Sequence, residues 1–190
     1  MNLNNNQVLL DLCLQDNIPI IRDQTAFLIE KIILENNFHS LFEVGTAYGY
    51  SASLWIQIPQ LTNITTIEKN EANHVLAKQY VHHDNLHLVL GDAFTYEPET
   101  KFDLIFIDGP KSHQENLITH YIEYLNPNGI IVIDNLFLNK IRQIPEELRS
   151  KNQNNLIKKL DDFVLWLQRL PNWSFKFLDL DDGIGILKRV

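Results

Sequence analysis

The sequence of 190 residues contains little cysteine and has no long apolar run. Its lone cysteine, Cys13, cannot form a disulfide within the chain, which indicates a reducing compartment and favours a small core residue over a nucleophile. No run approaches the roughly 18 apolar residues of a transmembrane helix. The N-terminus has neither the basic start nor the small-residue cleavage site of a signal peptide. We therefore expect a cytoplasmic protein that does not span a membrane.

Positive charge is also scarce. The chain has 16 Lys and Arg residues against 24 Asp and Glu residues, a formal net charge of −8. A nucleic-acid partner would have to be bound by a local basic patch, against the field of the whole molecule. One segment is rich in basic residues: Lys140, Arg142, Arg149, Lys151, Lys158 and Lys159. Glu146 and Glu147 interrupt it, so a solvated helix and loop explains the same residues equally well.

Short apolar runs alternate with amphipathic runs of about a dozen residues, which is typical of a parallel α/β sheet. The expected strands are 39–44, 63–69, 86–92, 102–109 and 129–135, and the expected helices are 24–36, 51–58, 71–83 and 113–125. After them we expect a helix over 156–170 and two strands, 173–180 and 182–189, joined by a tight Asp-Gly turn. The prediction is one α/β domain over residues 1–190, mostly parallel, with an antiparallel C-terminal edge hairpin and helices on both faces.

The stretch "EVGTAYGYSAS" follows the first expected strand and predicts a nucleotide-type pocket. Ligands of open α/β sheets bind outside the carboxyl ends of the strands, where Glu43, Gly45 and Ser51 fall. The stretch has neither the Gly-Lys-Ser/Thr of a Walker loop nor GxGxxG spacing, and a purely structural strand-to-helix turn remains an alternative. Glu68, 23 positions after Gly45, could accept hydrogen bonds from a ribose.

Asp92 and Ala93 follow the third expected strand and could meet an adenine edge. An isolated Asp at a strand end is most often a turn former or helix cap. However, Glu43, Glu68 and Asp92 stand at three successive strand ends. The series favours an adenosine ligand.

The fourth and fifth expected strands end in "FIDGPK" and "VIDN". Asp108, Asp134 and the Asn135 carbonyl would supply three hard oxygens at adjacent strand ends, the ligands preferred by Mg²⁺, Ca²⁺ or Mn²⁺. Lys111, three residues after Asp108, could act as a general base if the metal and partial burial depress its pKa. Each pair alone is more often a cap or a turn, and Lys111 could equally be a solvated loop residue. Together with the pocket, they favour a metal site.

In this order the motifs "LFEVGTAYGYSAS", "TTIEKN", "LGDAF", "FDLIFIDGPK" and "GIIVIDN" resemble the cation-dependent O-methyltransferases, the family of catechol and caffeoyl-CoA methyltransferases and their bacterial relatives. The resemblance runs from about Ile18 to the C-terminus. It implies a Rossmann-like α/β methyltransferase fold, an S-adenosylmethionine pocket, Mg²⁺ or another divalent cation, and a homodimer. The implied cofactor residues are Ile21, Glu43, Gly45, Ser51, Glu68, Asp92, Ala93 and Asp108; the implied metal ligands are Asp108, Asp134 and Asn135; the implied catalytic residues are Lys111 as general base and Asp108.

A narrower resemblance concerns the substrate. The stretches "DNIPIIRDQT", "DNLF", "KKLDDFVLWL" and "DDGIGILKR", with the basic segment, are similar to the bacterial branch that methylates 5-hydroxyuridine at the wobble position of tRNA. The alternative acceptor is a small catechol-like or acyl-CoA phenolic molecule, which the acidic charge and the short chain favour. Both acceptors offer a chelating pair of oxygens. A nucleotide-binding module without catalysis is a third hypothesis, and the complete set Asp108, Lys111, Asp134 and Asn135 argues against it.

Overall fold

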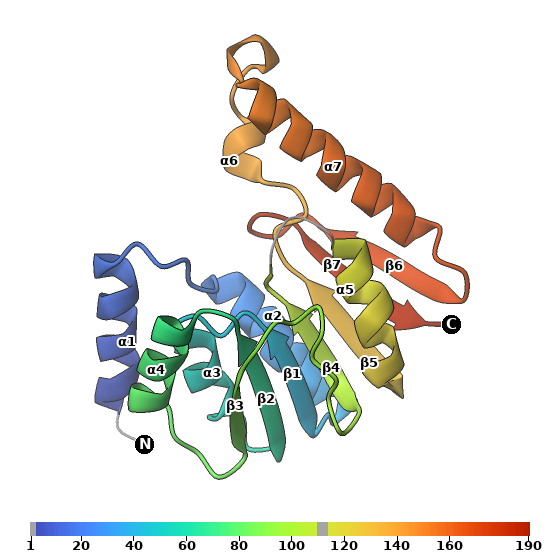
Figure 1. Cartoon of the computed structure of the whole chain (residues 1–190). Helices are drawn as coiled ribbons and strands as arrows, with labels where there is room; N and C mark the ends of the chain where they lie inside the picture. The colour runs from blue at the N-terminus through green and yellow to red at the C-terminus, as the bar shows by residue number, and fades with distance from the viewer. Residues whose placement is uncertain (1–2, 110–113) are drawn as a thin grey trace.

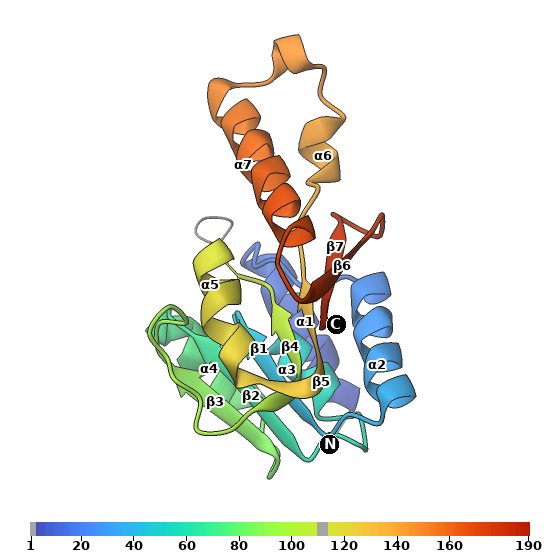
Figure 2. The same ribbon diagram turned by 90° about the vertical axis from the view of Figure 1, so that its right-hand side faces the viewer.

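The computed structural model describes residues 3–109 and 114–190, and a seven-stranded sheet lies at its centre (Figures 1 and 2). The strand order is β3-β2-β1-β4-β5-β7-β6. The strands are β1 (Ser40–Val44), β2 (Asn63–Glu68), β3 (Leu86–Leu90), β4 (Phe102–Ile107), β5 (Leu125–Ile133), β6 (Trp173–Leu178) and β7 (Ile184–Arg189). The α-helices are α1 (Leu3–Gln15), α2 (Asp23–Asn36), α3 (Tyr50–Trp55), α4 (Glu71–Tyr80), α5 (Gln114–Tyr121), α6 (Asn139–Arg142) and α7 (Lys151–Gln168), with 3₁₀ turns η1 (Ile122–Tyr124) and η2 (Glu146–Leu148).

The predicted fold class is confirmed. Strands β1 to β5 pair in parallel, and β7 joins the sheet antiparallel to both β5 and β6. The chain builds outward from β1 through β2 to β3 and then returns to place β4 on the other side of β1, so the strand order reverses between β1 and β4. Val44 is level with Ile107 there. A ligand crevice is therefore expected just beyond these two residues.

The sheet is covered on both faces because its central strands are apolar on both sides. Alternate strand residues point to opposite faces: Leu41 packs in the core on the α1, α2 and α3 side, whereas Phe42 packs in the core on the α5 and α7 side. Both side chains are fully buried. No helix in the described ranges has both the length and the apolar character needed to cross a membrane.

Several local features differ from the sequence-based expectation. Helices α1 and α6 were not predicted, and β5 begins at Leu125 and not at residue 129. Helix α7 begins at Lys151 instead of near residue 156, because Ser150 and Gln153 form a capping box at its start. The β6–β7 connection is a five-residue loop, 179–183, and not a two-residue turn, since Leu178 is paired with Ile184.

The segment from α6 to α7, residues 139–168, projects from the body of the molecule in both ribbon views, and we call it the arm. Its foot is packed on the sheet: Phe163 and Leu167 of α7 are buried in the same core as Leu187 of β7. The arm is thus anchored on the α5 side of the sheet, in the core that contains Leu187 of β7.

Candidate functional site

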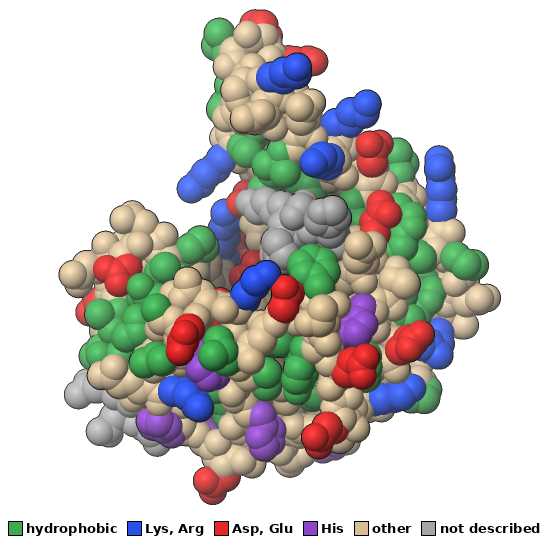
Figure 3. Space-filling view, viewed as in Figure 1, with side chains coloured by type: hydrophobic (Ala, Val, Ile, Leu, Met, Phe, Trp, Pro, Cys, Tyr) green, Lys and Arg blue, Asp and Glu red, His purple; other side chains and the backbone are tan. Residues whose placement is uncertain are grey.

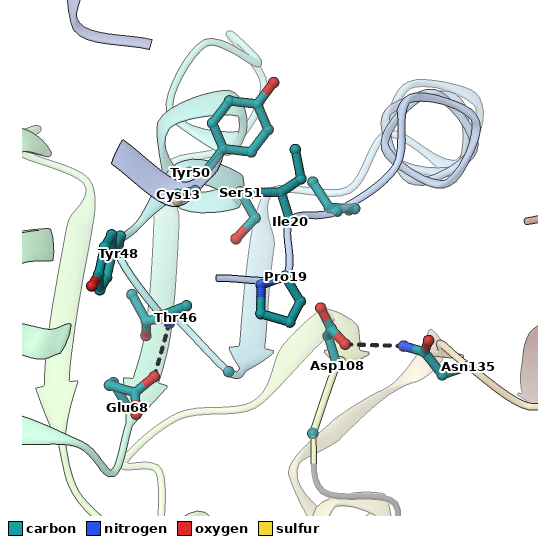
Figure 4. A pocket seen from close by; sticks show the side chains of 14 residues that line it. Cys13, Pro19, Ile20, Thr46, Tyr48, Tyr50, Ser51, Glu68, Asp108 and Asn135 are labelled. Atoms are coloured by element: carbon teal, nitrogen blue, oxygen red, sulfur yellow. Dashed lines mark hydrogen bonds between the residues drawn. The ribbon is translucent and has the colours of Figure 1, made fainter. Parts of the chain in front are cut away.

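A cavity of about 330 Å³ opens at the carboxyl ends of β1, β2 and β4, at the reversal of strand order (Figure 4). This volume is within the usual range of small-molecule sites, about 300–1,000 Å³. The predicted residues that line it are Ile21, Gly45, Ser51, Glu68, Asp108 and Asn135. The lining residues that sequence reasoning missed are Cys13, Pro19, Ile20, Thr46, Ala47, Tyr48, Tyr50 and Gly109. Most of these residues lie within a few positions of a predicted one, so their place in the sequence could have indicated them.

Gly45 allows the end of β1 to approach the end of β4. Its φ is +107°, and a Cβ at this position would lie 2.2 Å from the carbonyl oxygen of Asp108. Gly49 has φ +89° and precedes α3. The turn is fixed further by the amides of Gly45 and Thr46, which both donate to the carbonyl of Ile67 on β2. In the structure these glycines allow close approach to other parts of the chain, and the close approach to a ligand stays a prediction.

Glu68 connects the turn to the end of β2. One carboxylate oxygen accepts a hydrogen bond from the Ala47 amide at 2.8 Å, and the other accepts one from the Asn70 amide at 2.7 Å. Glu68 and Asp108 lie on opposite sides of the cavity in Figure 4. The carboxylate at the end of β2 thus lies at the cavity wall, and its contact with a ribose stays a prediction.

Glu43 does not line the cavity. Its side chain is fully buried and accepts hydrogen bonds from Trp55 Nε1 at 3.1 Å and Thr66 Oγ1 at 2.9 Å, and Ser51 also bonds to it. Burial raises the pKa of Glu43, and the hydrogen bonds from Ser51, Trp55 and Thr66 oppose that rise. Glu43 thus holds Ser51, which does reach the cavity.

Asp92 and Ala93 also stand outside the cavity lining. The Asp92 carboxylate pairs with Lys69 Nζ at 2.7 Å and accepts from the Phe94 amide at 3.0 Å. The Lys69 hydrogen bond lowers the pKa of Asp92. The Ala93 carbonyl accepts from the Tyr121 hydroxyl at 2.8 Å. The adenine contacts assigned to these two residues stay a prediction.

Asp108, Asp134 and Asn135 come together at the ends of β4 and β5. The Asp134 amide donates to the Ile107 carbonyl at 3.0 Å, so the two strand ends are level. Asn135 connects the acids: its Nδ2 donates to Asp108 Oδ1 at 3.3 Å, and its amide donates to Asp134 Oδ1 at 2.6 Å. Figure 4 shows the Asp108–Asn135 bond at the edge of the cavity. Lys111, the predicted base, lies outside the described residues.

The oxygen atoms of these three residues fit a hard divalent cation. Asp108 and Asp134 would supply carboxylate oxygens, and Asn135 would supply a carbonyl oxygen. Asp134 is only 9% exposed, and burial raises its pKa, while the hydrogen bond from the Asn135 amide and the charge of Arg22 lower it. A buried carboxylate normally requires a cationic partner. Within the described part of the chain, no three His, Cys, Asp or Glu side chains form a possible metal site, so the candidate set consists of two acids and an oxygen of Asn135.

Comparison with known proteins adds family and fold. A model of the family described as O-methyltransferase matches residues 10–190. A crystal structure of a "putative caffeoyl-CoA O-methyltransferase" from Staphylococcus aureus is 29% identical, with a TM-score of 0.87 over 97% of this chain and 92% of that chain. A methyltransferase from Podospora anserina, bound to S-adenosylhomocysteine, has the same fold at 23% identity, with a TM-score of 0.76 over 90% of this chain and 80% of its own.

One curated relative has a stated activity that differs from methyl transfer to oxygen. The "probable cobalt-precorrin-6B C(15)-methyltransferase (decarboxylating)" of Thermoplasma volcanium is 26% identical over 150 residues, which are 74% of this chain and 73% of that protein. Its named reaction methylates carbon. The family model, which spans nearly the whole of the present chain, describes transfer to oxygen.

Proposed function

This chain belongs to the O-methyltransferase family, and on that premise we propose that it methylates a hydroxyl group of a small catechol-like or phenolic acceptor with the help of a divalent cation held by Asp108, Asp134 and Asn135. The enzyme class itself is S-adenosylmethionine-dependent O-methyltransferase. The observation that carries the proposal is the arrangement of two strand-end carboxylates, joined through Asn135, at the edge of the cavity.

In this proposal the cavity binds S-adenosylmethionine through the residues of its wall. Glu68 would accept hydrogen bonds from the ribose hydroxyls, and the backbone at Gly45 would leave room for the amino-acid part near Ser51. Ile21 would cover the cofactor with an apolar side chain, since it is 4% exposed and lines the cavity. Glu43 would act indirectly by orienting Ser51.

The metal ligands would orient the acceptor. A divalent cation bound there would lower the pKa of a coordinated hydroxyl, which makes the oxygen a better nucleophile at neutral pH. Asp108 lines the cavity, and its strand β4 pairs with β5, whose end carries Asp134. The acceptor would therefore be held next to the methyl donor. Most of the rate gain would come from this positioning. From its spacing to Asp108, we propose Lys111 as the group that accepts the hydroxyl proton.

A small acceptor is supported by the charge of −8 and by the likeness to the Staphylococcus aureus protein. The second candidate is a 5-hydroxyuridine in tRNA, and one observation favours it. The arm carries six Lys or Arg residues and four Asp or Glu residues in an otherwise acidic chain. Arg142 bonds to Asp161 and to the Phe137 carbonyl, and Arg149 bonds to the carbonyls of Ile144 and Arg142. The exposed lysines of the arm remain for phosphate contacts: Lys140, Lys151, Lys158 and Lys159.

The test is methyl transfer from labelled S-adenosylmethionine with Mg²⁺, offering a small catechol and a tRNA that carries 5-hydroxyuridine in parallel. We expect label in the catechol, lost when a chelator is added. Label in the tRNA alone, with a rate that falls as salt is added, would replace the small acceptor by RNA.

The matched variants are Asp134→Asn, which removes the negative charge of a proposed metal ligand without changing side-chain size, and Asp179→Asn, which makes the same change at an exposed acid outside the site. We expect the first to lower turnover by at least about a hundredfold and the second to leave it unchanged. Full turnover by Asp134→Asn, or full turnover in chelator, would exclude the metal mechanism.

A further inference from the structure

One loop forms hydrogen bonds with two segments next to the candidate site that are distant in sequence: the start of α2 and the chain that follows Asn135. The loop is the β6–β7 connection, residues 179–183, which we call the acidic turn because it contains Asp179, Asp181 and Asp182. It lies outside the cavity lining and was not among the predicted site residues.

The acidic turn holds the beginning of α2. Asp181 Oδ2 accepts hydrogen bonds from the amide and the hydroxyl of Thr25 at 3.1 and 2.7 Å. Thr25 is fully buried in the first turn of the helix. Asp182 forms an ion pair with Arg22, the residue just before α2. The residues that precede Arg22 are Pro19, Ile20 and Ile21, which line the cavity. The acidic turn thus fixes the segment that covers the proposed cofactor.

The same turn holds the chain that follows the proposed metal ligands. The carbonyl of Asp182 accepts from the amides of Phe137 and Leu138 at 2.7 and 3.2 Å, and the carbonyl of Gly183 accepts from the amide of Leu136 at 2.9 Å. Asn139 Nδ2 donates to the carbonyl of Asp181. Leu136 follows Asn135 directly in the chain. Movement of the β5 end is therefore restricted by the turn.

The close approach is built into the sequence at Gly183. Its φ is +88°, and a Cβ there would lie 2.6 Å from Phe137 Cβ and 2.8 Å from the Phe137 amide nitrogen. Asp181 itself has φ +52°, a left-handed conformation that Asp, Asn and Gly adopt most readily. The "DDG" of the sequence thus serves contact with two other segments besides reversing the chain.

We propose that Asp181 is a positioning residue that couples the cofactor pocket to the metal site, so that each ligand raises the affinity for the other. This inference rests on the proposed function. When a cation binds Asp134 and Asn135, the acidic turn and the start of α2 are restrained with them. Binding of the cofactor beneath Ile21 then costs less conformational entropy. Coupling of this kind is reciprocal, and it typically amounts to about 5- to 150-fold in affinity.

The variants follow from the geometry. Asp181→Gly removes both bonds to Thr25 but suits the left-handed backbone, and Asp181→Asn keeps an acceptor oxygen at the same place. Thr25→Val removes the hydroxyl donor from the other side of the contact. Asp179→Asn is the matched control: it removes one charge from the same loop, and the exposed Asp179 makes no side-chain hydrogen bond to any described residue.

The measurement is the affinity for S-adenosylhomocysteine by calorimetry, without and with saturating Mn²⁺, in the intact protein. In the wild type and in Asp179→Asn, we expect Mn²⁺ to tighten binding at least about 5-fold. In Asp181→Gly the ratio should fall close to one, with Asp181→Asn and Thr25→Val between the two. Circular dichroism shows which variants fold. If Asp181→Gly does not fold, Thr25→Val tests the same contact from its other side.

The outcomes separate the two proposals. Binding of Mn²⁺ by itself is followed by its electron paramagnetic resonance signal. If the wild type binds Mn²⁺ but its affinity for S-adenosylhomocysteine is unchanged, or if folded Asp181→Gly and Thr25→Val keep the wild-type ratio, the coupling role is wrong and the metal mechanism stands. If the wild type binds no Mn²⁺, the proposed function fails, and the coupling with it.

Discussion

At the scale of single residues, the same chemical group has different roles because its surroundings differ. Glu43, Glu68 and Asp92 all stand at strand ends, and the sequence predicts all three as cofactor contacts. Glu68 reaches the cavity, whereas Glu43 is enclosed by side chains of α3 and β2, and Asp92 is paired with Lys69. The partners that decide these roles come from other elements, so spacing along the chain could not distinguish the three acids.

Asp103, at the beginning of β4, has a structural role, because its carboxylate binds residues at the start of β1. Its carboxylate accepts from the amides of His39 and Ser40, from the Ser40 hydroxyl and from Asn126 Nδ2. Burial alone would raise the pKa of Asp103, but these hydrogen bonds together lower it from its ordinary value of 3.8. A depressed pKa in the folded state stabilises the protein above the unfolded pKa, and this contribution is lost as the pH falls through the folded pKa.

We predict that Asp103→Ala lowers the free energy of unfolding by about 1–3 kcal/mol at pH 7, because four donor groups lose a charged acceptor. The loss should be smaller at pH 2.5, because the stabilisation that comes from the depressed pKa is lost as the pH falls toward the folded pKa. Urea denaturation at the two pH values measures this difference. Asp84→Ala, at an exposed position, serves as the control. An equal loss at both pH values would contradict the pKa assignment.

At the scale of elements, the strands were predictable because their apolar runs are continuous and bounded by polar residues. Helix α1, which was not predicted, and the early start of α7 show what periodicity does not reveal. Helix α1 is set by burial of Leu9 and Cys13, which depends on tertiary contacts. For α7 a signal was present in the sequence: Ser150 and Gln153 have the spacing of a capping box, and the helix begins there.

The glycine turn between β1 and α3 is the element on which the cavity depends most. We predict that Gly45→Ala destabilises the protein by more than about 2 kcal/mol, because Ala disfavours positive φ and its Cβ would overlap the Asp108 carbonyl. Affinity for S-adenosylhomocysteine should fall at least about tenfold, since the ends of β1 and β4 must separate.

The matched control is Gly91→Ala. A Cβ at Gly91 would meet Ile67 Cδ1 at an ordinary 3.4 Å. Thermal unfolding and calorimetry on both variants provide the comparison. If Gly45→Ala behaved like Gly91→Ala in both measurements, the turn would not be the determinant of the cavity.

At the scale of the whole molecule, charge is unevenly distributed. The arm has an excess of two positive charges within a chain of net charge −8, and Lys and Arg side chains are visible along the projecting part in Figure 3. The sequence indicates the basic segment but could not show that Arg142 and Arg149 hold the arm together. Fold class could be predicted from patterns along the chain, whereas the choice of acceptor depends on a surface formed only after folding.

The most direct test of the account is a crystal structure grown with S-adenosylhomocysteine and Mn²⁺, with anomalous scattering recorded to locate the metal. We predict S-adenosylhomocysteine in the cavity beneath Ile21, with a ribose hydroxyl on Glu68. The Mn²⁺ peak should lie within about 2.0–2.6 Å of oxygens from Asp108, Asp134 and Asn135. S-adenosylhomocysteine bound in the cavity with no anomalous peak at these three residues would contradict the metal-dependent mechanism.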